Sequence, residues 1–348
     1  MKKLILICLT AGVVLTGCSG GTENVTAAMS HIAEGSLKEA EDSLEAARQN
    51  KEDAQLIERA EGILCMSRGE YEEAIPHFEQ ALAQSPGRVG DPEIDISYYL
   101  MSAQEKTGQL DEAINTCSAI IGMRPQDAEA CFLRGQLNIK NDLYDDALRD
   151  FNRAVDLKGS DPDMYLRIYE FLNENGYDEA ARYYLNQAQK LNGHFSDYQK
   201  GKMAYCAGDY ELARDYLEKA RMSEEEGVIL YLGRTYEALG DYNFAASLYR
   251  TYSEKHPEDA QILGQLALCS IAIEDYEAAM EAVEKGLEVG DEGMKKSLEF
   301  DRIVILEHMG NFEEAKKQVK DYVKAYPDDE AGKKEKDFLT QWDRFGAD

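Results

Sequence analysis

Cysteine and histidine are the side chains best suited to bind a metal or act as nucleophiles, but their spacing favours neither chemistry. None of the cysteines belongs to a CxxC pair, and the five histidines are far apart in the sequence. The HExxH, GxSxG, GxGxxG, P-loop and EF-hand patterns do not occur. No pair of carboxylates is fixed by a recognisable motif either. We therefore expect no catalytic residue, no metal site and no cofactor.

Five cysteines remain after Cys8 and Cys18, and they are Cys65, Cys117, Cys131, Cys206 and Cys269. Each stands in an apolar helical context, where a thiol behaves as a small hydrophobic group. The odd number argues against a disulfide framework, although a bridge between Cys117 and Cys131 stays open as an alternative. We interpret these residues as core positions.

The N-terminal segment has the organisation of a bacterial secretion signal. Lys2 and Lys3 precede an apolar run over residues 4–15, which is shorter than the roughly 20 residues that span a bilayer. The run ends in the sequence LTGC at residues 15–18, which resembles the lipobox of bacterial lipoproteins. An ordinary secretion signal followed by a chance cysteine is the alternative interpretation.

The lipobox resemblance implies that residues 1–17 are a signal peptide and that Cys18 becomes a lipid-modified N-terminus. Diacylglycerol on its thiol, with a further acyl chain such as palmitate on its amine, would bury methylenes at about 0.8 kcal/mol each. Residues 18–23 would then form a flexible tether. We expect a protein held by lipid on the extracytoplasmic face of the cell membrane, or of an outer membrane if the cell has one.

The charge balance is strongly acidic. The chain has 67 Asp and Glu against 38 Lys and Arg, a net charge of -29 and a mean hydropathy of -0.51. Such a body repels phosphate backbones and anionic lipids, and the sequence shows no local basic patch. We expect no nucleic-acid partner and no membrane contact besides the lipid anchor. The 7 prolines in 348 residues indicate a mostly helical fold.

Self-similarity with a period near 34 residues fills the rest of the chain. Nine segments align on a central alanine, at Ala40, Ala74, Ala113, Ala147, Ala180, Ala213, Ala245, Ala279 and Ala315. A large apolar or aromatic residue stands three places before each alanine, and a mostly large apolar residue stands four places after it. Each unit therefore predicts one apolar helical stripe.

Two further columns of small residues support the repeat. Five places before the alanine, six units have Gly, while Asp142 and Asn175 occupy two others, as a tight turn between helices requires. Twelve places before it stand residues small enough for two helices to cross closely, namely Ala28, Gly62, Gly135, Gly201, Gly233 and Ala267. Met101, Ile168 and Ile303 depart from this second column.

These columns resemble the tetratricopeptide repeat (TPR), a helix-turn-helix of 34 residues. The resemblance implies an all-α fold, a right-handed α-solenoid or TPR superhelix of about nine repeats over residues 24–329. Residues 330–348 place Phe338, Leu339 and Trp342 at helical spacing, so we expect a C-terminal capping helix. Local irregularity is expected in the longer link between the second and third repeats.

The resemblance also implies where a partner would bind, because the first helices of TPR proteins line a concave groove. The residues that we assign to this groove are Tyr98, Phe132, Gln136, Tyr165, Tyr169, Tyr198, Lys202, Tyr205 and Arg234. Tyrosine offers a large contact area with few rotors and a hydroxyl that orients a ligand. We expect a non-catalytic scaffold for a protein or an extended peptide. Packing between repeats, and a glycan- or solute-binding lipoprotein, are the alternatives.

Overall fold

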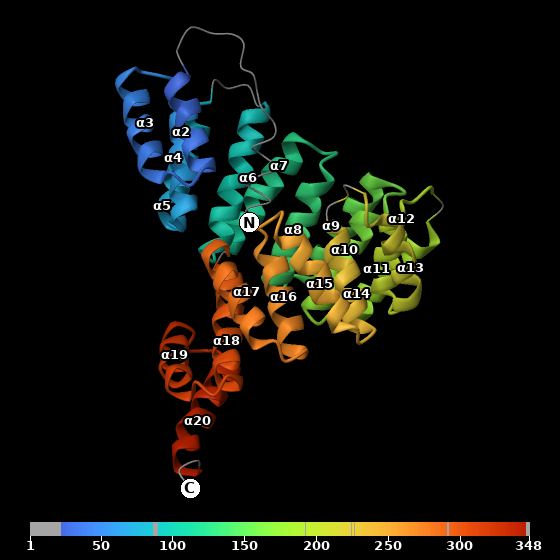
Figure 1. Ribbon diagram of the computed structural model, residues 1–348. Coiled ribbons are helices and arrows are strands. Elements are labelled where there is room, and N and C mark those ends of the chain that lie inside the picture. The colour runs from blue at the N-terminus through green and yellow to red at the C-terminus, as the bar shows by residue number, and fades with distance from the viewer. Residues whose placement is uncertain are drawn as a thin grey trace. The chain divides into compact units, whose positions relative to one another are not determined.

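The computed structural model describes residues 22–85, 90–191, 193–223, 225, 227–290 and 292–345. This described part is helical throughout, with nine consecutive helix pairs followed by one further helix (Figure 1). The predicted all-α, α-solenoid fold class is thereby confirmed. The predicted signal segment, Cys18 and residues 86–89 of the link between the second and third repeats lie outside the described residues.

The first helices of the nine pairs are α2 (Glu23–Ala33), α4 (Ala54–Arg68), α6 (Asp91–Lys106), α8 (Ala128–Lys140), α10 (Pro162–Glu174), α12 (Asp197–Cys206), α14 (Val228–Ala238), α16 (Ala260–Ala272) and α18 (Glu292–His308). The second helices are α3 (Leu37–Gln49), α5 (Tyr71–Ala83), α7 (Leu110–Met123), α9 (Tyr144–Lys158), α11 (Asp178–Lys190), α13 (Tyr210–Ala220), α15 (Tyr242–Ser253), α17 (Tyr276–Val289) and α19 (Phe312–Ala325). The final helix, α20, spans Glu330–Phe345.

The chain divides into two compact units, one ending at Gln187 and the other beginning at Ala188. In the first unit, one apolar cluster extends from α2 to α6 and another from α8 into α11. In the second unit, clusters join α12 to α15, α14 to α18, and α18 to α20. Each cluster draws on neighbouring helices, as expected of a stack in which each repeat buries its face against the next.

The turns inside the pairs use the left-handed backbone that the sequence predicts. The six predicted glycines have φ between 75° and 83°, and they are Gly35, Gly69, Gly108, Gly208, Gly240 and Gly310. Asp142 (φ 58°) occupies the same position as predicted, and Glu274 (φ 63°) does so in the eighth pair. Every turn thus reverses the chain within a few residues, which sets the two helices of a pair side by side.

The fifth pair differs from the sequence prediction by one residue. Gly176, with φ 79°, takes the left-handed position that was assigned to Asn175, whose φ is -96°. A residue without a Cβ adopts this backbone at lower energy than asparagine, so the turn forms at the glycine. In consequence Ala181, and not the predicted central Ala180, is fully buried at the start of α11, while Ala180 is partly exposed.

The small residues of the first helices lie where the two helices of a pair cross. A Cβ added to Gly62 or Gly135 would come within 2.5 Å of the ring of Phe78 or Phe151, respectively. Gly201 has the same relation to Leu217. The predicted close crossing is confirmed at these positions, because each glycine leaves space for the large side chain four places after the central alanine.

The last helix packs against the ninth pair. Leu339 of α20 is fully buried in a cluster with Ile303, Val319 and Tyr322, while Phe338 remains 47% exposed. The side chain of Trp342 lies outside the described residues. These contacts support the proposal that α20 covers the apolar end of the stack.

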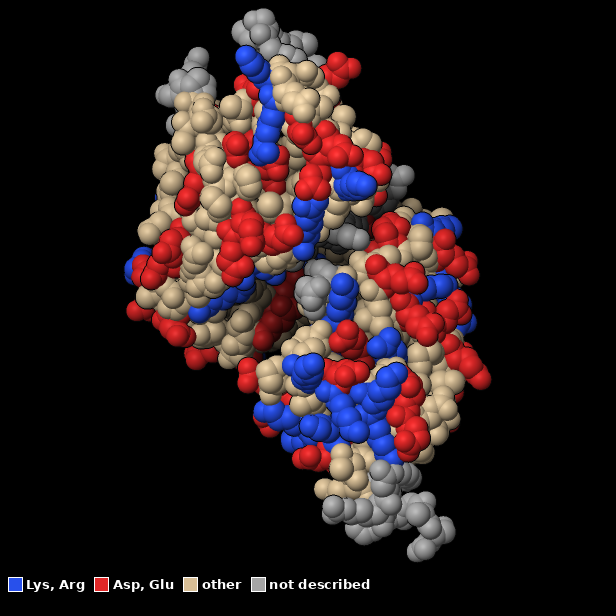
Figure 2. Space-filling model, turned by 90° about the vertical axis from the view of Figure 1, so that its left-hand side faces the viewer, with Lys and Arg blue, Asp and Glu red and all other residues tan. Residues whose placement is uncertain are grey.

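The surface charge corrects one conclusion drawn from the sequence. Acidic side chains cover much of the face shown in Figure 2, but Lys and Arg side chains gather over α19 and α20. Residues 316–336 supply seven lysines to these helices and their link. The sequence prediction that the chain has no local basic patch was therefore wrong, because it rested on the charge of the whole chain.

Candidate functional site

All nine residues assigned to the groove lie on first helices. In the first unit they come from α6 (Tyr98), α8 (Phe132 and Gln136) and α10 (Tyr165 and Tyr169). In the second unit they come from α12 (Tyr198, Lys202 and Tyr205) and α14 (Arg234). The two sets belong to different compact units, so each is described separately.

Tyr98 connects the third repeat to the fourth. Its hydroxyl donates a hydrogen bond of 2.9 Å to Oδ2 of Asp127. Asp127 is the N-cap of α8, and its Oδ1 accepts the backbone N–H of Ala130 at 3.1 Å. Burial and the carboxylate of Asp127 raise the pKa of the Tyr98 phenol. The half-buried ring therefore positions the start of the next first helix as well as facing the surface.

Phe132 lies almost entirely inside the core of the first unit, with 4% of its surface exposed. Arg167 of α10 lies over its ring, with the guanidinium carbon 4.3 Å from the ring centroid. The same guanidinium donates two hydrogen bonds of 2.7 Å to the carboxylate of Glu129. The structure thus presents a planar ion pair beside this ring, and the sequence prediction did not include Arg167 or Glu129.

A similar ion pair joins two earlier first helices. Arg59 of α4 donates a hydrogen bond of 2.5 Å to Oδ2 of Asp95 on α6. Its guanidinium also lies 5.4 Å from the ring centroid of Tyr99. A charge-assisted contact between successive first helices therefore recurs along this unit. The signal that could have found it is an arginine and an acidic residue spaced 36 or 38 positions apart, in either order.

Gln136, Tyr165 and Tyr169 are half-buried. Tyr165 and Tyr169 lie one turn apart on α10 and pack against the core of the first unit while keeping part of each ring accessible. Burial, with a contribution from Asp156, raises the pKa of the Tyr165 phenol. Its hydroxyl consequently stays protonated and can donate a hydrogen bond near neutral pH.

In the second unit the predicted residues of α12 surround a tyrosine that the sequence analysis missed. The ring of Tyr231 lies 6.1 Å from that of Tyr198 and 5.4 Å from that of Tyr205, both edge-on. Nζ of Lys202 lies 5.0 Å from the Tyr231 centroid, and Lys202 is 8% exposed. Tyr231 stands one residue beyond the face that the sequence prediction considered, which explains its omission.

Burial also raises the pKa of the Tyr205 phenol, while Arg234 acts in the opposite direction. Arg234 is half-buried on α14 and contributes positive charge beside the Tyr205 ring. The α12 and α14 residues therefore form one cluster of aromatic rings and cations. We call Tyr198, Lys202, Tyr205, Tyr231 and Arg234 the second-unit aromatic cluster.

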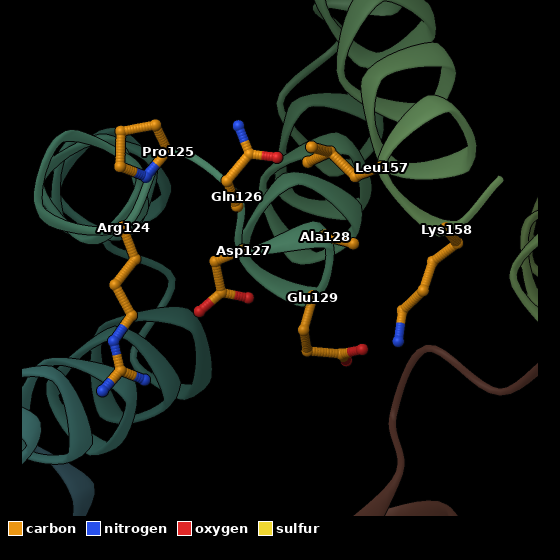
Figure 3. A pocket seen from close by; sticks show the side chains of 8 residues that line it. All are labelled: Arg124, Pro125, Gln126, Asp127, Ala128, Glu129, Leu157 and Lys158. Carbon is orange, nitrogen blue, oxygen red and sulfur yellow. The ribbon is translucent and has the colours of Figure 1, made fainter.

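A cavity of about 570 Å³ lies in the first unit beside the start of α8. Figure 3 shows its lining, which comes from the α7–α8 link, the first residues of α8 and the end of α9. The charged groups of Arg124, Asp127 and Glu129 already have partners in Asp91, Tyr98 and Arg167. These three side chains are held by structural contacts, and the residues that line the cavity include no Ser, Thr, Cys or His.

Cys117, Cys131 and Cys269 are buried core residues as predicted, whereas Cys65 and Cys206 are half-buried. All five that the structure describes are free thiols, including Cys117 and Cys131, so the bridge that the sequence left open is absent. Burial raises the pKa of Cys117 to about 12, which keeps this thiol protonated. Within the described residues, no group of three or more His, Cys, Asp or Glu side chains could hold a metal ion. Nor does any helix there have the length and apolar character to cross a membrane.

The helix pairs, their glycine turns and their close crossings define a solenoid of helical-hairpin repeats. Sequence profiles of the tetratricopeptide repeat match residues 25–89, 66–137, 128–161 and 230–293, which together exceed half of the chain. The chain belongs to the tetratricopeptide repeat family.

Among curated proteins, the chain is similar to DnaJ homolog subfamily C member 3. It is 28% identical over 141 residues to the protein from Gallus gallus and 27% identical over 144 residues to the one from Bos taurus. These matches cover 38% and 41% of this chain, and 24% and 25% of the relatives. The chain thus spans about a quarter of the length of the relatives it matches.

Two solved structures illustrate the similarity to known folds. A tetratricopeptide repeat protein from Parabacteroides merdae has a TM-score of 0.46 and 17% identity, over 80% of this chain and 97% of that one. The APC/C hetero-tetramer Cut9–Hcn1 has a TM-score of 0.48 and 14% identity, over 91% of this chain and 62% of that one.

Proposed function

We propose that this protein is a non-catalytic scaffold that binds a protein segment or extended peptide on the first-helix faces of its repeats. The observation that carries the proposal is the second-unit aromatic cluster, in which packing fixes three tyrosine rings beside two cationic side chains. The partly exposed rings of Tyr198 and Tyr205, held in place against the buried Tyr231, lose little entropy when a partner covers them. The half-buried Arg234 adds attraction for carboxylates or carbonyl groups of that partner.

The first unit offers a second surface of the same chemistry. Tyr165 and Tyr169 keep part of their rings accessible, and Gln136 provides an amide donor and acceptor on the neighbouring helix α8. Phe132 is mainly a core residue, and Tyr98 is committed to Asp127. Binding in this unit should therefore depend most on the two α10 tyrosines.

The proposal includes the location. The LTGC sequence at residues 15–18 supports lipid modification of Cys18 and retention on the extracytoplasmic face of a membrane. Replacing Cys18 with Ser should move the protein from the membrane fraction to the soluble fraction of cells. Membrane association that persists in this variant after a high-salt wash would refute the lipid anchor.

The binding surface is testable by site-specific crosslinking. A photoreactive phenylalanine at position 169 or 205 should crosslink a defined partner in native membranes, identified by mass spectrometry. The matched control carries the same probe at Tyr183, which is 53% exposed on the second helix α11. Equal crosslinking of one partner from position 183 would contradict selective use of the first-helix faces.

The partner found by crosslinking should then bind the purified protein with an affinity that falls at least tenfold when Tyr165 and Tyr198 are replaced by Ala. Truncating central aromatic side chains commonly removes 1–2 kcal/mol or more of binding free energy. Replacing Tyr183 with Ala should leave the affinity unchanged. A panel of soluble glycans tested in parallel distinguishes the peptide scaffold from a glycan-binding lipoprotein, because a true ligand raises the unfolding midpoint with concentration.

A further inference from the structure

The lysines of α19 and α20 concentrate positive charge on an otherwise acidic protein. Residues 316–336 contain seven lysines and five acidic residues, whereas the whole chain has 38 basic and 67 acidic residues. Figure 2 shows the resulting gathering of basic side chains. We call Lys316, Lys317, Lys320, Lys324, Lys333, Lys334 and Lys336 the C-terminal lysine patch.

Helix α19 is amphipathic, and Lys317, Lys320 and Lys324 face away from the core, whereas the Lys316 side chain is only 12% exposed. The buried side of this helix carries Ala315, Val319 and Tyr322. With 100° per residue, Lys317, Lys320 and Lys324 fall on the opposite side, within roughly 60° of one another. All three are exposed, and they extend over about 10 Å of helix. The row is therefore available to a flat surface that approaches this helix.

Part of this positive charge is neutralised within the protein, and part is not. Lys316, Lys317 and Lys333 pair with Glu313, Glu314 and Glu330 at 3.0, 3.5 and 2.7 Å. In the part of the chain that the structure describes, no ion pair involves Lys320, Lys324 or Lys334. These three exposed ammonium groups are therefore accessible to an external anion.

An exposed aromatic ring adjoins these charges on α20. Lys334 and Phe338 are four residues apart, so they share one face of the helix, and the Phe338 side chain is 47% exposed. Cations beside an accessible aromatic ring are typical of helices that lie at a membrane interface. The ring can enter the headgroup layer while the ammonium groups remain among the phosphates.

We propose that the C-terminal lysine patch docks on the anionic headgroups of the membrane that carries the protein. Lysine suits a layer of anionic headgroups because its ammonium is a hydrated point charge. It lacks the planar guanidinium with which arginine selects individual carboxylates. A cluster of four to eight basic residues on an amphipathic helix is typical of anionic lipid binding. A bilayer meets the patch on one side, whereas a long nucleic acid would also meet the acidic remainder of the chain.

The choice of lipid as partner rests on the proposed anchorage at Cys18. Acyl chains at the N-terminus would hold the whole chain at the bilayer, so that a weak attraction of the patch for the headgroups acts at a high effective concentration. The patch would then add a second point of attachment and limit the orientations that the second unit can take relative to the bilayer. This role differs from that of the aromatic residues, which remain on the first helices.

Flotation with lipid vesicles tests the patch without the acyl anchor. The protein used is the chain from residue 18 with Cys18→Ser, which keeps every described residue. Vesicles contain phosphatidylcholine alone or with 30% phosphatidylglycerol. We expect binding to the anionic vesicles only, and at least tenfold weaker binding at 0.5 M NaCl than at 0.05 M.

The decisive variant carries Lys317→Gln, Lys320→Gln and Lys324→Gln, and should bind the anionic vesicles at least about tenfold more weakly. The matched control carries Lys38→Gln, Lys106→Gln and Lys255→Gln, three exposed lysines on other parts of the surface, and changes the net charge equally. It should bind like the parent. Circular dichroism verifies that both variants remain helical.

Three results would overturn the proposal. The first is equal binding to neutral and anionic vesicles, and the second is equal loss in the two triple variants. The third is absence of vesicle binding together with salt-sensitive self-association that the α19 substitutions abolish, which would identify a second copy as the occupant. Failure of the Cys18→Ser fractionation in cells would refute the anchor separately, because the vesicle assay contains no acyl chain.

Discussion

Replacing Gly135 with Ala should destabilise the protein although alanine is the better helix former. Alanine is favoured over glycine inside a helix by about 1 kcal/mol. At Gly135 the added Cβ would lie 2.5 Å from Cε1 and 2.7 Å from Cδ1 of Phe151. Ordinary carbon contacts are near 3.5–4.0 Å, so the overlap is about 1 Å.

The ring of Phe151 has little freedom to relieve this overlap. It is fully buried, and its centroid lies 5.9 Å from that of Phe132, 6.1 Å from that of Phe171 and 6.3 Å from that of Tyr184. Overpacking of such a core destabilises by about 1–3 kcal/mol. After subtracting the helix preference, we expect a net loss of up to about 2 kcal/mol.

Urea unfolding followed by circular dichroism measures this loss, with Gly122→Ala as the matched control. Gly122 lies inside α7 and has no atom near the position of its missing Cβ, so alanine there should stabilise by about 0.5–1 kcal/mol. Opposite signs for the two variants are the expected result. A midpoint that rises equally in both would show that the helices do not cross closely at Gly135.

A double-mutant cycle then identifies the contact. Phe151→Val alone should cost about 2–4 kcal/mol because it empties part of the core. Combined with Gly135→Ala, it reproduces the small–medium pair that the chain already has at Ala267 and Val283. The double variant should be at least about 1 kcal/mol more stable than the sum of the single losses. If the two losses in unfolding free energy were strictly additive, the strain in Gly135→Ala would not come from contact with Phe151.

Three more predictions concern other parts of the fold. Burial and the neighbouring Glu335 raise the pKa of Glu307 to about 7 from its ordinary 4.5, so the folded state favours the protonated acid. The free energy of unfolding should therefore fall as the pH rises from about 4.5 to 7. The thermal midpoints at pH 5 and pH 8 should differ less in Glu307→Gln than in the parent protein. Asp150→Ala should cost about 3–5 kcal/mol in urea unfolding, because Arg134 loses two hydrogen bonds of 2.9 and 2.6 Å inside the fold; a loss below 1 kcal/mol would refute this. Leu339→Ala should cost about 2–5 kcal/mol and speed amide exchange in α20, whereas unchanged exchange would show that α20 does not depend on this contact.

The sequence predicted the repeat and its turns because both depend on local chemistry. Glycine at a left-handed turn and a small residue at a helix crossing are requirements of the backbone, so they recur at fixed spacing. Asn175 was misassigned because asparagine also tolerates that backbone, and only the neighbouring Gly176 decides the turn. Spacing alone does not distinguish such adjacent candidates.

The candidate site could be predicted only in part. Helical periodicity placed Tyr165 and Tyr205 on the first helices, but it could not show that Tyr98 bonds to Asp127 or that Arg167 lies over Phe132. Those contacts join residues 29 and 35 positions apart, and they depend on how successive repeats stack. The lysine patch escaped prediction for a related reason, since the total charge does not show where lysines gather on the surface of two neighbouring helices.

The contacts between successive first helices have a mechanical consequence. Arg59 with Asp95, Tyr98 with Asp127, and Arg167 with Glu129 each fasten one repeat to the next and to no other. A pulling force applied along the first unit would therefore act on all of these contacts in series, and they would break one at a time. Extension under tension should proceed in steps of about one repeat. A force transmitted through a bound partner would then unfold single repeats while the remaining repeats stay folded.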